Sequence, residues 1–203
     1  MKRLAILASG QGTNMEAILN AIERGEVAGR VVLVLSDRAE APALRRARAR
    51  GIKSLWIDPS LYPDRAAYDR ALLQELNAAG VELVILAGFM RLLSPVLIEA
   101  FPLRIMNIHP SLLPAFPGTD GVEQALAYGV KVTGCTVHFV DEGLDTGPVI
   151  LQEAVPVIQE DTVETLHQRI HAAEYRIYPR AIDLFCRGKI IIEGRRCRII
   201  DGN

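Results

Sequence analysis

Residues 3–14 read RLAILASGQGTN, and this stretch decides the fold class. Its continuous apolar run is typical of a strand buried on both faces, and a glycine-rich turn then leads into a helical pattern over residues 14–25. The alternation repeats, with strands predicted at 30–36, 53–57, 81–89 and 103–108 and helices at 41–51, 64–80 and 94–101. Buried strands alternating with helices predict a doubly wound α/β fold, in which helices flank a mainly parallel sheet.

The pattern changes after about residue 111. Apolar runs at 133–140 and 147–157 are separated by the loop DEGLDT, and they predict mixed or antiparallel strands in the C-terminal half. A long helix is predicted over 161–188, beginning at Asp161 or Thr162 and kinked or broken at Pro179. The last run predicts a hairpin turning at Glu193–Gly194. We expect one domain over residues 1–203, with a soft division between 1–110 and 111–203.

Composition and charge exclude several classes of protein. Lys and Arg number 23 against 24 Asp and Glu, so the basic excess typical of nucleic-acid binders is missing. No apolar run is long enough to span a membrane, and the N-terminal run is too short for a signal peptide. Three cysteines without a C-x-x-C spacing favour a reducing compartment and argue against zinc or disulfides. We expect a cytoplasmic protein with no nucleic-acid or membrane partner.

The glycine loop SGQGTN has two readings. It is a strand–helix turn that needs the backbone freedom of glycine, or it is an anion site formed by backbone amides at a helix N-terminus. Gly10 and Gly12 match the start of a dinucleotide-binding fingerprint, but Met15 stands where that fingerprint has its third glycine. A phosphomonoester held by the amides of Gly12, Thr13 and Asn14 fits better.

Polar side chains also lie at the ends of the predicted strands. Asn107 and His109 are two residues apart and point to the same side, as a polar end-cap or as a reaction site. The glycine-flanked Asp145 could approach His109, although its loop also reads as an ordinary solvated turn. His167 and His171 are four residues apart on one helix, but without H-E-x-x-H an ordinary helix surface is favoured over a metal site.

Six motifs in order along nearly the whole chain resemble the folate-dependent formyltransferase family: SGQGTN, SDRAEAPALRRA, AGFMRLLSP, NIHPSLLPAFPG, TGCTVHFVDEGLDTGPVI and EYRIYP. The resemblance implies transfer of the formyl group of 10-formyltetrahydrofolate to the primary amine of 5′-phosphoribosylglycinamide, in de novo purine biosynthesis. It also implies small-molecule substrates, folate as a consumed cosubstrate, no tightly bound cofactor, no metal, and a monomer or homodimer. Residues 1–110 would then form a phosphate-binding half and residues 111–203 the folate-site half.

The resemblance also implies roles for individual residues. The catalytic set falls on Asn107, His109 and Asp145, with Thr136 and His138 in support. The substrate phosphate falls on Gly12, Thr13 and Asn14, and other substrate contacts fall on His171 and Glu174. Folate contacts fall on Arg65, Met90, Arg91, Leu92, Leu93, Asn107, Asp141, Glu142, Gly143, Leu144 and Asp145. The chain departs from some family members at Ala115 and in the 118–123 loop, and these departures leave the role of that loop open.

Three other functions compete with this interpretation. Hydrolysis of 10-formyltetrahydrofolate would use the same Asn, His and Asp, but enzymes of that type carry an additional N-terminal module that we do not expect here. Formyl transfer to methionyl-tRNA would need a C-terminal RNA-binding domain and a basic excess. A non-enzymatic phosphosugar or folate sensor would keep the glycine loop but would not need the three catalytic side chains.

Overall fold

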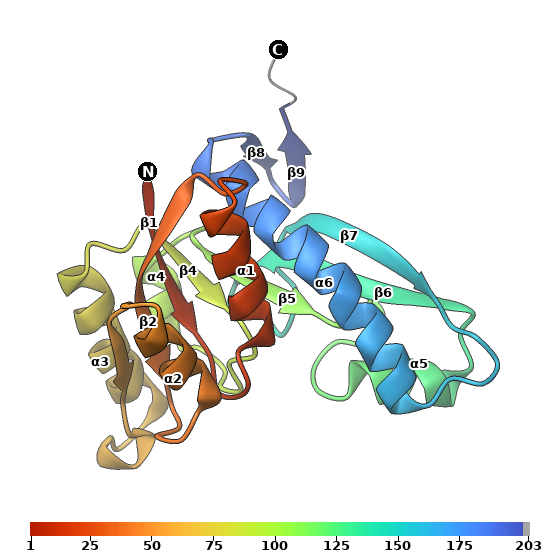
Figure 1. Ribbon diagram of the computed structural model, residues 1–203, viewed down its shortest axis with the longest axis horizontal. Helices are drawn as coiled ribbons and strands as arrows, with labels where there is room; N and C mark the ends of the chain where they lie inside the picture. Colours follow the sequence, from red (N-terminus) through yellow and green to blue (C-terminus); the bar gives the residue numbers. More distant parts are fainter. Residues whose placement is uncertain (201–203) are drawn as a thin grey trace. The chain divides into compact units, whose positions relative to one another are not determined.

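The structure is a computed structural model that describes residues 1–200 (Figure 1). Its contacts divide the chain into two compact units, Met1–Met106 and Asn107–Asn203, and the boundary falls within strand β5 (Ile105–His109). The soft division expected after residue 110 lies close to this boundary. The expectation of a single domain stays a prediction.

The first unit contains a parallel sheet in the order β3–β2–β1–β4. Its strands are β1 (Lys2–Leu7), β2 (Gly29–Ser36), β3 (Ser54–Trp56) and β4 (Leu83–Leu86). Leu4 to Leu7 and Leu83 to Ile85 are completely buried, as expected for strands covered on both faces. β4 is shorter than predicted, because the chain turns away after Ala87 through Gly88 at φ 72°.

Helices cover this sheet as predicted for a doubly wound fold. They are α1 (Thr13–Glu23), α2 (Pro42–Ala49), α3 (Arg65–Ala78) and α4 (Pro95–Ala100), with a 3₁₀ turn η1 (Pro59–Leu61) before α3. α1 contacts α2, and α3 contacts α4. The strand order reverses between β1 and β4, so the connections after these two strands go to opposite sides of the sheet. Ligands of open α/β sheets bind in the crevice at such a switch point.

The second unit contains the mixed sheet that the sequence predicts, in the order β5–β6–β7–β9–β8. β6 (Val132–Phe139) and β7 (Val149–Pro156) are antiparallel, and β9 (Arg196–Ile199) runs parallel to β7. β8 (Ile190–Glu193) and β9 form the expected hairpin. Its turn is Gly194–Arg195, one residue later than predicted.

Helix α6 (Val163–Cys186) covers β6 and β7. Thr162 caps its N-terminus in a reciprocal capping box with Thr165, as the sequence allows. Of the kink or break predicted at Pro179, the break is wrong, since α6 continues through this residue, and the kink stays a prediction. Pro179 costs one backbone hydrogen bond, whereas the turns around it bury Ile177, Tyr178, Ala181 and Ile182.

Helix α5 (Gly121–Tyr128) has no counterpart in the sequence prediction. Its N-cap residue Asp120 is left-handed at φ 60° and makes no side-chain capping bond, and a glycine of low helix propensity follows. The usual start signal is therefore missing, although Gly129 gives a typical stop. Within residues 1–200, none of the helices combines the length and apolar character needed to cross a bilayer.

Candidate active site

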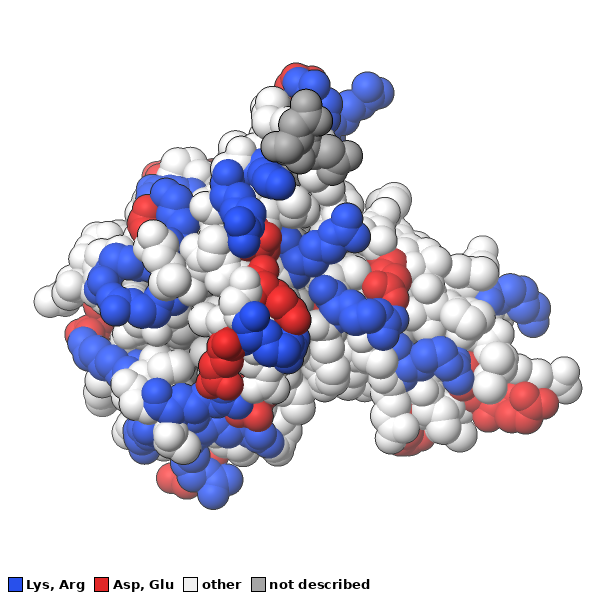
Figure 2. Space-filling model, turned by 45° about the horizontal axis from the view of Figure 1, so that its top comes forward, with Lys and Arg blue, Asp and Glu red and all other residues white. Residues whose placement is uncertain are grey.

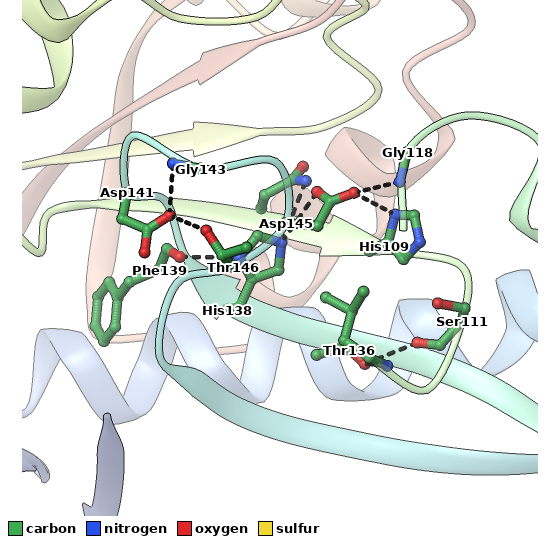
Figure 3. Close-up of polar contacts among 12 residues, drawn as sticks. His109, Ser111, Gly118, Thr136, His138, Phe139, Asp141, Gly143, Asp145 and Thr146 are labelled. Carbon is green, nitrogen blue, oxygen red and sulfur yellow. Dashed lines mark hydrogen bonds and ion pairs between the residues drawn. The ribbon is translucent and has the colours of Figure 1, made fainter. Parts of the chain in front are cut away.

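His109 is the last residue of β5, and its imidazole is only 4% exposed. Nε2 lies 2.7 Å from the carbonyl oxygen of Phe116, and because a carbonyl only accepts, Nε2 must donate. The other nitrogen, Nδ1, lies 3.5 Å from Oδ2 of Asp145 (Figure 3). Both ring nitrogens therefore face oxygen acceptors, so a proton on either nitrogen has a hydrogen-bond acceptor nearby.

Asp145 projects from the loop between β6 and β7. Its backbone is left-handed at φ 53°, and Oδ2 accepts a 2.8 Å hydrogen bond from the amide of Gly118. The same loop is braced internally, since Asp141 Oδ1 accepts from the amide of Gly143 and the hydroxyl of Thr146 (Figure 3). These bonds hold the carboxylate of Asp145 toward His109 although its backbone conformation is unfavourable for a non-glycine residue.

His138, on β6, joins Asn107 to this group. Its Nδ1 donates to the carbonyl of Phe139 at 2.8 Å, and burial lowers its pKa below the ordinary value. The neutral ring therefore presents Nε2 as an acceptor, 3.5 Å from Nδ2 of Asn107 and 3.6 Å from Oδ1 of Asp145. An amide turned this way has its second N–H available for a ligand.

A buried hydroxyl network holds the loop that follows β5. Thr136 Oγ1 donates to the carbonyl of Ser111 at 2.7 Å, and it accepts from the amide of Leu113 and the side chain of Gln152. Ser111 Oγ donates to the carbonyl of Ala115 at 2.5 Å. The network fixes the segment 111–116, whose Phe116 carbonyl accepts the hydrogen bond from His109 Nε2. Thr136 thus contacts the site through a loop.

Several residues of the site were not found by sequence reasoning. The carbonyl of Phe116 and the amide of Gly118 carry no sequence signal, because any residue supplies them. The sequence left the role of the 118–123 loop open. In the structure the amide of Gly118 donates to Asp145, and a Cβ at Gly121 would lie 3.5 Å from His109 Nε2. This loop therefore encloses the imidazole from the side of Nε2.

His171 and Glu174, expected to contact substrate, form an ion pair on α6. Nδ1 of His171 lies 2.7 Å from Oε2 of Glu174, whose side chain is almost completely buried. The ring of His171 stacks between those of His167 and Tyr175, with centroids 4.1 Å and 5.8 Å away. The pair places a carboxylate and a titratable imidazole on one face of α6.

The two histidines of α6 are expected to titrate at different pH values. The hydrogen bond to Glu174 raises the pKa of His171 above the ordinary value of about 6.5, and burial lowers that of His167. The stabilising contribution of the His171 pair is then fully present below the unfolded pKa and is lost as pH rises through the folded pKa. An NMR titration of the imidazole resonances should give a higher midpoint for His171 than for His167. Glu174→Gln should bring the His171 midpoint down, and an unmoved midpoint would refute the assignment.

The phosphate-site and part of the folate-site predictions fall in the first unit. Gly12 is the N-cap of α1 at φ 75°, which suits glycine, and Thr13 begins the helix. After β4, the amide of Met90 donates to Ser9 Oγ at 2.9 Å, which ties this loop to the loop after β1. Met90 and Leu92 are 66% and 61% exposed, so apolar surface is available for a ligand.

Two arginines predicted to contact folate also lie in the first unit. Arg91 stacks its guanidinium over the ring of Tyr68 at 5.0 Å, and Arg65 begins α3. Leu93 precedes Ser94, whose amide and hydroxyl both donate to the buried Asp69 at 2.5 Å and 2.7 Å. Asp69 thus fixes the end of the 90–93 segment, a support that sequence reasoning missed. Glu142 and Leu144 are exposed in the loop that carries Asp145.

Cys135 on β6 is completely buried, so it is a small residue of the core, and burial raises the pKa of its thiol to about 12. Between residues 1 and 200, no three His, Cys, Asp or Glu side chains are grouped so that they could hold a metal ion.

Comparisons with known proteins agree with these features. A profile of the formyl transferase family matches residues 2–182. The chain is 46% identical to phosphoribosylglycinamide formyltransferase of Bacillus subtilis (strain 168), over 90% of the chain and 93% of that relative. It is 58% identical to glycinamide ribonucleotide transformylase 1 of Symbiobacterium toebii, whose crystal structure superposes with a TM-score of 0.98 over 99% of this chain and 95% of that one. It is also 43% identical to a trifunctional purine biosynthetic protein of Bos taurus, covering 98% of the chain but 20% of that longer protein.

Proposed function

The chain belongs to the formyl transferase family, and we infer that it transfers the formyl group of 10-formyltetrahydrofolate to the primary amine of 5′-phosphoribosylglycinamide. The products are formylglycinamide ribonucleotide and tetrahydrofolate, and the step belongs to purine biosynthesis. The structural observation that carries this inference is the approach of Asn107, His109 and Asp145 to one another around His138.

The reaction needs an oxyanion binder and a proton carrier. The amine nitrogen attacks the formyl carbon, a C–N bond forms, and the carbonyl oxygen becomes negatively charged. The bond from that carbon to N10 of the folate then breaks, and the proton lost by the amine ends on N10. Atoms and charge balance without a further reactant.

Asn107 is proposed to bind the oxyanion. The orientation of its amide toward His138 leaves one Nδ2–H free, and a neutral amide donates at every physiological pH. A fixed donor of this kind stabilises charge that develops only in the transition state. His138 is then a positioning residue, because its bare Nε2 sets which end of the amide presents the donor.

His109 and Asp145 are proposed to move the proton. Nδ1 of His109 is the nitrogen on the side of the Asp145 carboxylate, while Nε2 is held by the Phe116 carbonyl. A proton on Nδ1 can support the oxyanion together with Asn107. The gap of 3.5 Å is longer than a good hydrogen bond, so a water held by the carboxylate can relay the proton from the amine to N10.

Other assignments remain part of the proposal. The amides at Gly12, Thr13 and Asn14 would hold the phosphate, and His171 with Glu174 would contact the same substrate. The exposed segment 90–93, Arg65 and the loop 141–145 would contact the folate. A cytoplasmic location and a monomer or homodimer stay predictions.

A direct assay tests the function. Purified protein is incubated with 10-formyltetrahydrofolate and 5′-phosphoribosylglycinamide, together and singly, and formylated ribonucleotide is measured by mass spectrometry. Product is expected only with both substrates. Rapid loss of the formyl group from the folate without the amine would favour the hydrolase alternative, and binding without any product would favour a sensor.

A further inference from the structure

Helix α2 packs directly on the glycine loop of the first unit. The amide of Ala43 donates to the carbonyl of Gly10 at 3.2 Å. A Cβ at Gly12 would lie 2.9 Å from Cβ of Ala43, a distance closer than real side chains approach. Glycine at position 12 therefore allows α2 to pack directly against the loop, and side chains from the first turns of α2 lie beside it.

A groove lies at this junction. It is lined by Gln11 from the glycine loop and by Pro42, Arg45, Arg46 and Ala49 from α2. Pro42 and Ala49 supply apolar surface, and the polar lining is one amide and two guanidinium groups. Among residues 1–200 no carboxylate lines the groove, so its chemistry suits an anion.

Two of the three arginines of α2 already have partners, as does Arg50, which caps its C-terminus. Arg46 lies 3.3 Å from Glu16, Arg48 donates to Ser54 Oγ at 3.1 Å, and Arg50 lies 2.5 Å from Glu23. The third arginine of α2, Arg45, is exposed, and it forms no ion pair or hydrogen bond within residues 1–200. Figure 2 shows Asp and Glu side chains among the Lys and Arg side chains of the surface, so acidic partners are not scarce.

The pairing of Glu16 matters for the loop. Glu16 lies in the first turn of α1, next to the amides proposed to hold phosphate, where its charge would oppose a second anion. Arg46 and Arg50 both lie within 3.5 Å of Glu16 and offset that charge. Arg45 is then the cation of α2 that remains for a ligand.

We propose that Arg45 is a further binding residue for the substrate phosphate, pairing with it across the groove that Gln11 shares with α2. The inference rests on the proposed function and deepens it. Backbone amides donate hydrogen bonds without neutralising a dianion, whereas a guanidinium supplies a full positive charge and a two-pronged donor that matches phosphate oxygens. Arg45 thereby makes the site selective for the phosphorylated amine over its nucleoside.

The test compares Arg45→Ala with Arg48→Ala, a control that removes the same charge from the same helix. Charge-assisted hydrogen bonds contribute about 1.5–3 kcal/mol, so Arg45→Ala should raise the KM for 5′-phosphoribosylglycinamide about tenfold or more. The KM for the folate and kcat should stay near wild type. The KM for the dephosphorylated nucleoside should not change, and Arg48→Ala should change each constant less than twofold.

Calorimetry with ribose 5-phosphate gives a readout that needs no turnover. Its Kd should rise about tenfold in Arg45→Ala, partly recover in Arg45→Lys, and stay constant in Arg48→Ala. Equal effects of the two alanine variants, or equal effects on nucleotide and nucleoside, would overturn the inference. Thr13→Val separates the two levels: if it weakens ribose 5-phosphate binding while Arg45→Ala does not, the glycine loop binds phosphate without Arg45. Absence of product from the wild type would instead reject the proposed function.

Discussion

Replacing His109 by glutamine is expected to lower kcat by about 10²–10⁴-fold, the usual contribution of a positioned proton carrier. The glutamine amide can still donate to the carbonyl of Phe116, which holds Nε2 of the imidazole at 2.7 Å. It cannot exchange a proton near neutral pH. The variant therefore removes the proton transfer while retaining a donor for the backbone contact.

Three observations would accompany that loss if the assignment is right. The KM values for both substrates should change little, because His109 acts in the transition state. The thermal unfolding midpoint should stay close to that of the wild type. Gln168→Ala, a control at an exposed position of α6, should keep near wild-type kcat. A folded His109→Gln protein with more than a third of wild-type turnover would contradict the role given to His109.

Replacing Asn107 by alanine is expected to lower kcat by about 10²–10³-fold, as the loss of one oxyanion donor does in other enzymes. The amide nitrogen lies 3.5 Å from Nε2 of His138, which keeps that nitrogen in a fixed orientation. Asn107→Asp preserves the shape but places negative charge where the oxyanion forms. It should be at least as damaging as alanine.

The pattern of constants distinguishes this role from simple binding. If Asn107 binds the oxyanion, kcat falls and the KM for folate changes little. A rise in the folate KM with kcat preserved would make Asn107 a binding residue only. His138→Ala should reproduce part of the kcat loss, because it releases the amide from its orientation, and an unaffected rate would remove His138 from the account.

The fold could be predicted where local pattern and burial agree. The run Leu4 to Leu7 is continuous and apolar because its strand is covered on both faces, and the parallel sheet followed from such runs. Helix α5 was missed because Asp120 caps it with left-handed backbone geometry and no side-chain bond. The helix is not broken at Pro179, because burial along α6 outweighs one missing hydrogen bond.

Only the side chains of the site could be predicted from the sequence. Asn107, His109 and Asp145 are polar residues at strand ends and in a glycine-flanked loop, and such residues attract notice in a sequence. The carbonyl of Phe116 and the amide of Gly118 do not, since backbone groups are the same at every position. Their positions depend on how the 111–121 segment folds back, which no local pattern encodes.

His109 and Asp145 are proposed to act as one proton-carrying unit, and a double-mutant cycle tests this coupling most directly. Single-turnover formyl transfer is measured for the wild type, His109→Gln, Asp145→Asn and the double variant. Asparagine at 145 retains an oxygen for the amide of Gly118. Groups that act as a unit are strongly non-additive, so the double variant should lose about as much rate as the worse single variant. A loss equal to the product of the two single losses would show that the residues act independently and would contradict the account.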